Sequence, residues 1–122
     1  MVWRKINSYC VLDKEEIITY VKKAYEDDRI NFFAVLTDRL SNKEIKTFIE
    51  KAYDDGNIDY FAVLSDGLSK KEIKAYIKKA YDDNKIDYFA ILVDNLSIKE
   101  IKEYGKKALK EGRTNFYALL FN

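Results

Sequence analysis

The stretch Leu40-Ser41-Asn42-Lys43-Glu44-Ile45 carries the signals of a helix start. Ser41 is a preferred N-cap residue, and Glu44 is placed to accept a hydrogen bond from the backbone N–H of Ser41, an arrangement known as the capping box. Leu40, before the cap, and Ile45, four residues after it, are placed to form a hydrophobic staple. The stretch therefore predicts a helix that begins at residue 42.

The same signals return every 28 residues, at Leu12-Asp13…Glu16-Ile17, Leu68-Ser69…Glu72-Ile73 and Leu96-Ser97…Glu100-Ile101. They divide the chain into four copies, 12–39, 40–67, 68–95 and 96–122, and the two inner copies agree at 19 of 28 positions. Residues 6–12 resemble the second half of a copy, so we expect residues 1–11 to form a capping half-repeat. A period of this length is typical of repeat architectures.

Each copy predicts two helices joined by a tight turn. In the second copy, Ile45, Phe48, Ile49, Ala52 and Tyr53 form one apolar stripe of a helix of about 14 residues. This helix should end at a column of residues that tolerate the left-handed conformation. A second helix of about 8 residues should follow a column of N-cap residues. The columns are Asp28, Gly56, Asn84 and Gly112 for the end, and Asn31, Asp59, Asp87 and Asn115 for the cap.

One such hairpin cannot bury both of its apolar faces, whereas stacked hairpins can. The sequence therefore predicts an all-α protein, namely a short right-handed α-solenoid of four 28-residue helix-turn-helix repeats plus the half-repeat, in a single domain. The period is shorter than those of the tetratricopeptide, ankyrin and HEAT repeats, and their signature residues are missing. The helices are expected to approach most closely at two alanine columns, Ala24, Ala52, Ala80 and Ala108, and Ala34, Ala62, Ala90 and Ala118.

Composition narrows the classes of function. The chain has 22 basic and 21 acidic residues, so no overall charge directs it to nucleic acid or a membrane surface. It has no His, which rules out Ser-His-Asp and Cys-His catalysis and His-containing zinc sites, and its single Cys10 rules out an intramolecular disulfide. It shows neither a long apolar run nor a signal peptide, so we expect a cytoplasmic protein.

The acidic turn at Asp54-Asp55-Gly56 resembles only the middle of an EF-hand loop. In that register Lys51 stands where the first carboxylate belongs, and Ala62 stands where the bidentate Glu is required. We therefore expect no metal and no cofactor. Because the chain also lacks a Gly-rich phosphate loop, we expect no enzyme.

The first turn of each short helix carries an aromatic residue, with an aliphatic residue one turn on. These columns are either wholly core or a continuous exposed strip, and an exposed apolar strip marks an interaction surface. We expect the second case: a non-enzymatic protein–protein interaction module, an adaptor or inhibitor, that binds a partner protein through this strip and the acidic turns beside it. The residues are Phe32, Tyr60, Tyr88 and Phe116, then Val35, Val63, Ile91 and Leu119, and in the turns Asp55 and Asp83.

Two alternatives remain. The lysine column Lys23, Lys51, Lys79 and Lys107 suggests a helical repeat that binds single-stranded RNA, although each row of lysines runs into an acidic turn. The third possibility is a structural or self-assembling module. The similarity of the copies is typical of recent duplication and of an engineered repeat alike.

Overall fold

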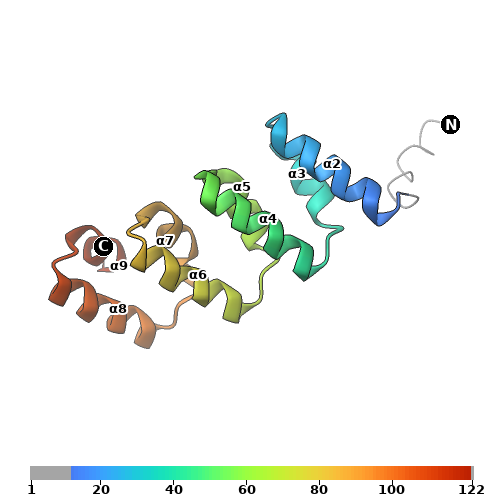
Figure 1. The fold of residues 1–122 in the computed structure, drawn as a ribbon. Coiled ribbons are helices and arrows are strands. Elements are labelled where there is room, and N and C mark those ends of the chain that lie inside the picture. Colours follow the sequence, from blue (N-terminus) through green and yellow to red (C-terminus); the bar gives the residue numbers. More distant parts are fainter. Residues whose placement is uncertain (1–11, 122) are drawn as a thin grey trace. The chain divides into compact units, whose positions relative to one another are not determined.

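The computed structural model describes residues 12–121, and over this range the only regular structure is helical (Figure 1). Each copy contributes a long helix and then a short one, which pack against each other. The long helices are α2 (Lys14–Glu26), α4 (Asn42–Asp55), α6 (Lys70–Asp82) and α8 (Ile98–Glu111). The short helices are α3 (Ile30–Thr37), α5 (Ile58–Ser65), α7 (Ile86–Leu92), continued by the 3₁₀ turn η2 (Val93–Asn95), and α9 (Thr114–Phe121).

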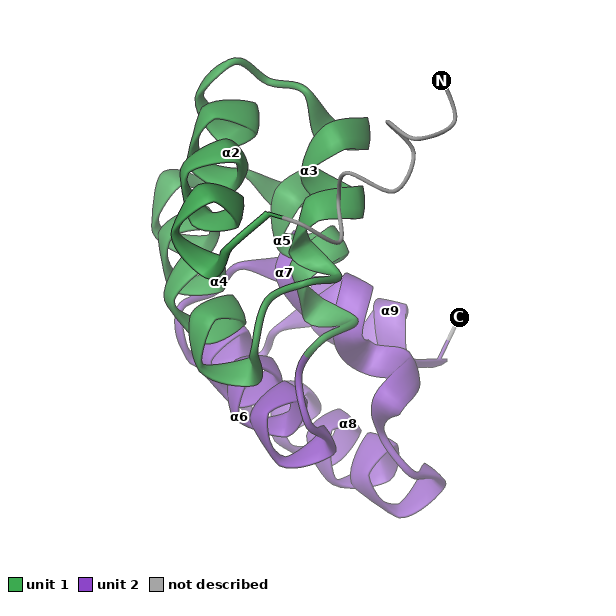
Figure 2. Ribbon diagram, turned by 90° about the vertical axis from the view of Figure 1, so that its right-hand side faces the viewer, with its two compact units in different colours: residues 1–67 green, residues 68–122 purple. Residues whose placement is uncertain are grey.

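The observed class is thus the predicted one, an all-α chain of consecutive helix pairs. The chain divides into two compact units, residues 1–67 and 68–122, and the division falls between the second and third copies (Figure 2). Within the first unit α3 also contacts α5, and within the second unit α7 contacts α9. The predicted half-repeat at residues 1–11, including Cys10, lies outside the described residues.

The four predicted capping boxes are confirmed. In α4 the Ser41 backbone N–H donates to Glu44 Oε1 at 2.7 Å, and the Glu44 N–H donates back to Ser41 Oγ at 3.3 Å. The same reciprocal pair opens the other three long helices. Hydrogen bonding from the backbone of Ser97, followed by a contact with the Lys74 ammonium, lowers the pKa of Glu100 to about 2.

The predicted left-handed helix ends are also confirmed, with φ values of 58° at Asp28, 73° at Gly56, 60° at Asn84 and 71° at Gly112. In each copy the N–H of the next residue donates to the carbonyl five residues back, which is the Schellman arrangement. The donors and acceptors are Arg29 and Ala24 at 2.8 Å, Asn57 and Ala52 at 2.9 Å, Lys85 and Ala80 at 2.8 Å, and Arg113 and Ala108 at 2.8 Å.

The predicted N-caps of the short helices are wrong. The cap residues of α3, α5 and α7 are Arg29, Asn57 and Lys85, and none of their side chains makes a capping hydrogen bond. The short helix begins as soon as the left-handed residue has ended the long one. The residues that were expected to be caps are therefore the second residues of the short helices. They are Asn31, Asp59, Asp87 and Asn115.

Burial separates the two alanine columns. Ala52, Ala80 and Ala108 are fully buried and Ala24 is nearly so, which agrees with close packing of the long helices. The alanines of the short helices do not belong to the buried core: Ala34, Ala62 and Ala90 are partly exposed and Ala118 is exposed. The short helices instead bury the aromatic residue that comes directly before each of these alanines. In the first three copies this residue is Phe33, Phe61 or Phe89.

The fourth copy differs from the others at two positions whose side chains lie next to each other, Gly105 and Phe121. A Cβ atom added to Gly105 of α8 would lie 2.2 Å from Cε2 of Phe121, so the aromatic ring of α9 occupies the space beside this glycine. At these two positions the other copies have Val21, Ile49 and Ile77, and Thr37, Ser65 and Val93.

Gly105→Ile should destabilise the protein, because the rigid ring of Phe121 blocks the new side chain; overpacking of this kind costs about 1–3 kcal/mol. Phe121→Ser in the same chain restores the pair of residue types found in the second copy, Ile49 and Ser65, and should recover most of the loss. Urea unfolding of the two single variants and the double variant measures the coupling. Additive changes in the free energy of unfolding would contradict this packing.

Candidate protein-binding groove on the short helices

The predicted aromatic strip is not exposed as a whole. Tyr60 is 2%, Tyr88 6% and Phe116 2% exposed, whereas Phe32 in the first copy is 56% exposed. The prediction of a continuous exposed aromatic surface is therefore wrong for three of its four rings. These rings lie one turn into helices that begin two residues earlier than predicted.

In the first unit the Tyr60 ring packs between two rings of the preceding copy. Its centroid is 4.7 Å from that of Phe33 and 5.0 Å from that of Tyr25, in edge-on geometry. The Tyr60 hydroxyl donates to Asp28 Oδ1 at 2.9 Å, so the polar end of the buried ring is satisfied. Burial, and then the hydrogen bond to Asp28, raises the pKa of Tyr60 to about 12.

The second unit has an equivalent cluster. Phe116 packs 5.1 Å from Phe89 and 4.9 Å from Tyr81, measured between ring centroids. The Arg113 guanidinium lies 4.3 Å from the centroid of Tyr81 and donates to the backbone carbonyl of the same residue. The Tyr81 hydroxyl donates to Glu111 at 2.8 Å, and burial together with this bond raises the pKa of Tyr81 to about 12.

The acidic turns have partners within the chain. Tyr25 of the first copy donates its hydroxyl to Asp55 of the second copy at 2.8 Å, a bond between the same two repeat positions as that from Tyr81 to Glu111. This bond, and then Lys51, hold the pKa of Asp55 below its usual range. Asp83 pairs with Lys79 at 3.6 Å. Asp55 and Asp83 thus both make local contacts in this structure.

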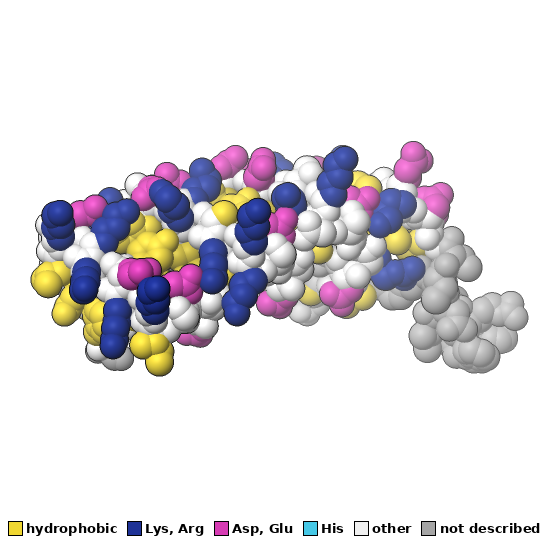
Figure 3. Space-filling model, turned by 90° about the horizontal axis from the view of Figure 1, so that it is seen from below, with side chains coloured by type: hydrophobic (Ala, Val, Ile, Leu, Met, Phe, Trp, Pro, Cys, Tyr) yellow, Lys and Arg dark blue, Asp and Glu magenta, His cyan; other side chains and the backbone are white. Residues whose placement is uncertain are grey.

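The lysine column is locally neutralised in three of its four members. Lys23 lies 3.3 Å from Asp27, Lys51 lies 3.2 Å from Asp55, and Lys79 lies 3.6 Å from Asp83, in each case an acid four residues further on. Lys107 lies over the Tyr81 ring, 5.1 Å from its centroid. On the face drawn in Figure 3, acidic side chains stand among the basic ones.

The face that the short helices expose is a different one. In α3 the residues Asn31, Ala34, Val35 and Asp38 are spaced by three, one and three positions, so they share one side of the helix. Val35 is 49% exposed, and Val63 and Ile91 at the same repeat position are partly exposed. The face thus carries small apolar side chains with an exposed Asx residue at each end. The acidic residue at the end of this face is Asp38 in the first copy, Asp66 in the second and Asp94 in the third.

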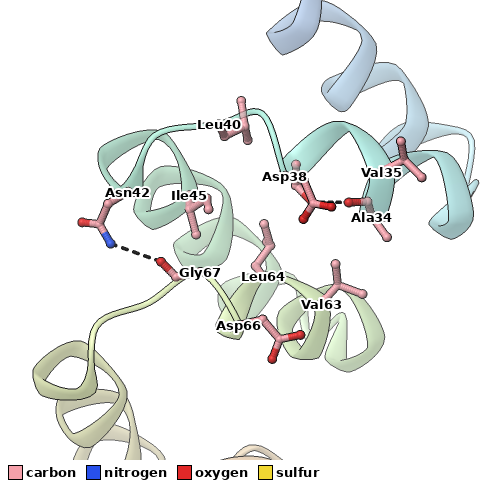
Figure 4. A pocket seen from close by; sticks show the side chains of 11 residues that line it. Ala34, Val35, Asp38, Leu40, Asn42, Ile45, Val63, Leu64, Asp66 and Gly67 are labelled. Atoms are coloured by element: carbon pink, nitrogen blue, oxygen red, sulfur yellow. Dashed lines mark hydrogen bonds between the residues drawn. The ribbon is translucent and has the colours of Figure 1, made fainter. Parts of the chain in front are cut away.

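Within the first unit this face is hollowed into a groove of about 520 Å³ between the ends of α3 and α5 (Figure 4). Leu40, Ile45 and Leu64 contribute buried apolar surface to its lining, and Val35 and Val63 contribute exposed or partly exposed surface. The acidic residues of the groove are Asp38 and Asp66. The Asn42 side chain donates to the Gly67 carbonyl at 3.2 Å and connects the start of α4 to the loop after α5.

The two carboxylates stand at unfavourable positions. Asp38 and Asp66 are the C-cap residues of α3 and α5, where the helix dipole places partial negative charge. Both are exposed, and neither makes an ion pair with another described residue. The groove therefore presents two uncompensated negative charges beside apolar surface, which suits a ligand that is basic and apolar.

Sequence reasoning missed this groove because it expected the short-helix alanines to lie where helices approach most closely. A signal was present: Asp38, Asp66 and Asp94 recur three residues after the aliphatic column, on the same helical face. It also missed the tyrosine-to-carboxylate bonds between copies. Their signal is a Tyr at one repeat position and an acid two positions further on in the next copy, and the fourth copy has Leu109 in place of this Tyr.

Among residues 12–121, no group of three or more His, Cys, Asp or Glu side chains is arranged to hold a metal ion. No helix in the described part of the chain is both long and apolar enough to cross a bilayer. Comparison of the sequence with protein-family models and curated proteins, and of the chain with solved structures, gives no match.

Alkaline titration should resolve the two buried phenols that donate to carboxylates, those of Tyr60 and Tyr81. An unfolded tyrosine has a pKa of about 10, whereas those of Tyr60 and Tyr81 are raised to about 12. The unfolded chain then loses protons first, so the stability that the two phenols contribute is complete below pH 10 and declines as the pH rises through 12. Ultraviolet phenolate absorbance should show a late step that is smaller in Tyr60→Phe and unchanged in Tyr20→Phe. A single step near pH 10 with the helicity intact would contradict the assignment.

Proposed function

We propose that the chain is a helical-repeat binding module whose short-helix groove holds a basic and apolar segment of a partner protein. In this proposal the helix pairs stack as a short α-solenoid, and the partner lies along the faces of α3 and α5. The observation that carries the proposal is the pair Asp38 and Asp66, which are exposed, opposed by the helix dipole and unpaired with any other described residue.

Three features of the groove support this partner chemistry. Its volume of about 520 Å³ is in the range of binding pockets. The first two copies carry 8 basic against 13 acidic side chains, which attracts a cationic segment before contact. The Val35 and Val63 side chains offer apolar surface that a partner can bury, and well-packed helices keep the groove preorganised.

The proposal replaces the aromatic anchors of the sequence prediction with an acidic and aliphatic site. Phe32 is exposed, and Val63 and Ile91 are partly exposed. The other three aromatic residues of the strip, Tyr60, Tyr88 and Phe116, are buried and do not serve as anchors. The contacts of the lysine column do not favour the RNA alternative, because Lys23, Lys51 and Lys79 are each paired with an acid four residues further on. The adaptor or inhibitor role stays a prediction.

Selection from a random displayed-peptide library tests the proposal. Enriched peptides should carry Lys or Arg beside apolar residues, and their affinity should fall with salt because the charges at the site are exposed. Asp38→Asn/Asp66→Asn should weaken binding by about five- to thirtyfold, since each exposed ion pair contributes up to about 1 kcal/mol.

The same double variant should unfold at higher urea concentration, because removing an anion from a helix C-terminus relieves about 0.3–1 kcal/mol at each site. The matched control is Glu50→Gln/Asp54→Asn, which removes two exposed charges from α4, away from the groove. It should leave peptide affinity unchanged. Enriched peptides without basic residues, or equal affinity for the groove variant and the wild type, would overturn the proposal.

A further inference from the structure

The first copy exposes an aromatic ring at a position that the other copies bury. Phe32 is 56% exposed, whereas Tyr60 and Phe116 at the same repeat position are each 2% exposed. In the first unit Tyr60 is covered by Phe33 of the preceding copy. In the second unit Phe116 is covered in the same way by Phe89 of its preceding copy. The position is therefore one that the preceding short helix covers.

A cavity of about 450 Å³ lies beside the exposed Phe32 ring. Tyr20, Ala24, Leu36 and Leu12 contribute to its lining. Tyr20 is 50% exposed, whereas Phe48 at the same position of the second copy is 9% exposed and belongs to the core. Two large side chains of the first copy thus lack the cover that their equivalents have in the second.

The chain itself leads into this cavity. Leu12 lines it, and the sequence immediately before Leu12 has the pattern of a short helix. Ile6, Tyr9 and Val11 stand where α3 has Ile30, Phe33 and Val35. Tyr9 is thus the counterpart of the residue that covers Tyr60. The segment also carries the positive charges of Arg4 and Lys5. The first copy has a net negative charge, from seven acidic and five basic side chains.

We propose that residues 1–11 occupy the cavity beside Phe32, with Tyr9 against the Phe32 ring, and supply the cover that a preceding copy supplies elsewhere. The site is an intramolecular docking surface on α2 and α3. It is separate from the acidic groove, whose lining includes neither Phe32 nor Tyr20. The proposal does not depend on what binds that groove.

Hydrogen exchange of the full chain, read by mass spectrometry, tests the docking. Backbone amides of residues 1–11 should exchange at least about tenfold more slowly in the protein than in a synthetic peptide of residues 1–13, because docked amides open only transiently. Phe32→Asp should abolish this protection while circular dichroism shows unchanged helicity. The matched control is Ile98→Asp in the second unit, where the side chain is 73% exposed; protection should persist.

Tyr9→Asp offers a second route that leaves the described helices untouched, and it should also abolish the protection. Exchange of residues 1–11 at peptide rates in the wild type would overturn the proposal. So would protection that survives both Phe32→Asp and Tyr9→Asp in folded protein. Protection that falls on dilution, together with a dimer in light scattering, would place the segment of a second copy in the cavity and would equally overturn intramolecular docking.

Discussion

One residue of the turn is hydrogen-bonded to both helices of every copy, and the packing of the hairpin depends on it. In the first copy the N–H of Arg29 closes the long helix on the Ala24 carbonyl at 2.8 Å. The carbonyl of Arg29 accepts the first hydrogen bond of the short helix, from Phe33, at 3.0 Å. Because one residue is bonded to both helices, the turn is short and its conformation is fixed. The same side chains therefore face inward in each copy. The residue before it must adopt positive φ, which explains why only Asp, Gly and Asn occur there.

The helix starts and ends of the long helices could be predicted because their signals are local. A capping box involves residues three positions apart, and a Schellman turn involves residues five apart. The start of the short helix could not be placed correctly for the opposite reason. The N-cap is Arg29, Asn57 or Lys85 in the first three copies, and none of these side chains makes a capping hydrogen bond. The position is set by the preceding turn, so the more suggestive column of Asn and Asp residues misled the prediction.

The candidate site was harder to predict, because exposure on a short helix depends on the neighbouring copy. Phe32 and Tyr60 occupy the same repeat position, yet one is half-exposed and the other is buried against Phe33. No pattern within a single copy distinguishes them. The side chains that the sequence analysis placed in the aliphatic part of the strip, Val63 and Ile91, do remain partly accessible. The acids of the groove were not singled out by the sequence analysis, which considered only the aromatic and aliphatic columns of the short helices.

The hydrogen bonds between copies divide donor and acceptor between two repeat units. Tyr25 belongs to the first copy and Asp55 to the second, and Tyr81 and Glu111 are divided in the same way within the second unit. A duplicated unit of 28 residues brings a hydroxyl for the copy after it and a carboxylate for the copy before it. Insertion or deletion of a whole unit that carries the Tyr therefore keeps a hydroxyl opposite a carboxylate at the new junction, whereas a partial unit leaves the phenol without its acceptor. These two bonds therefore favour changes in the length of the array by whole periods of 28 residues over changes by part of a period.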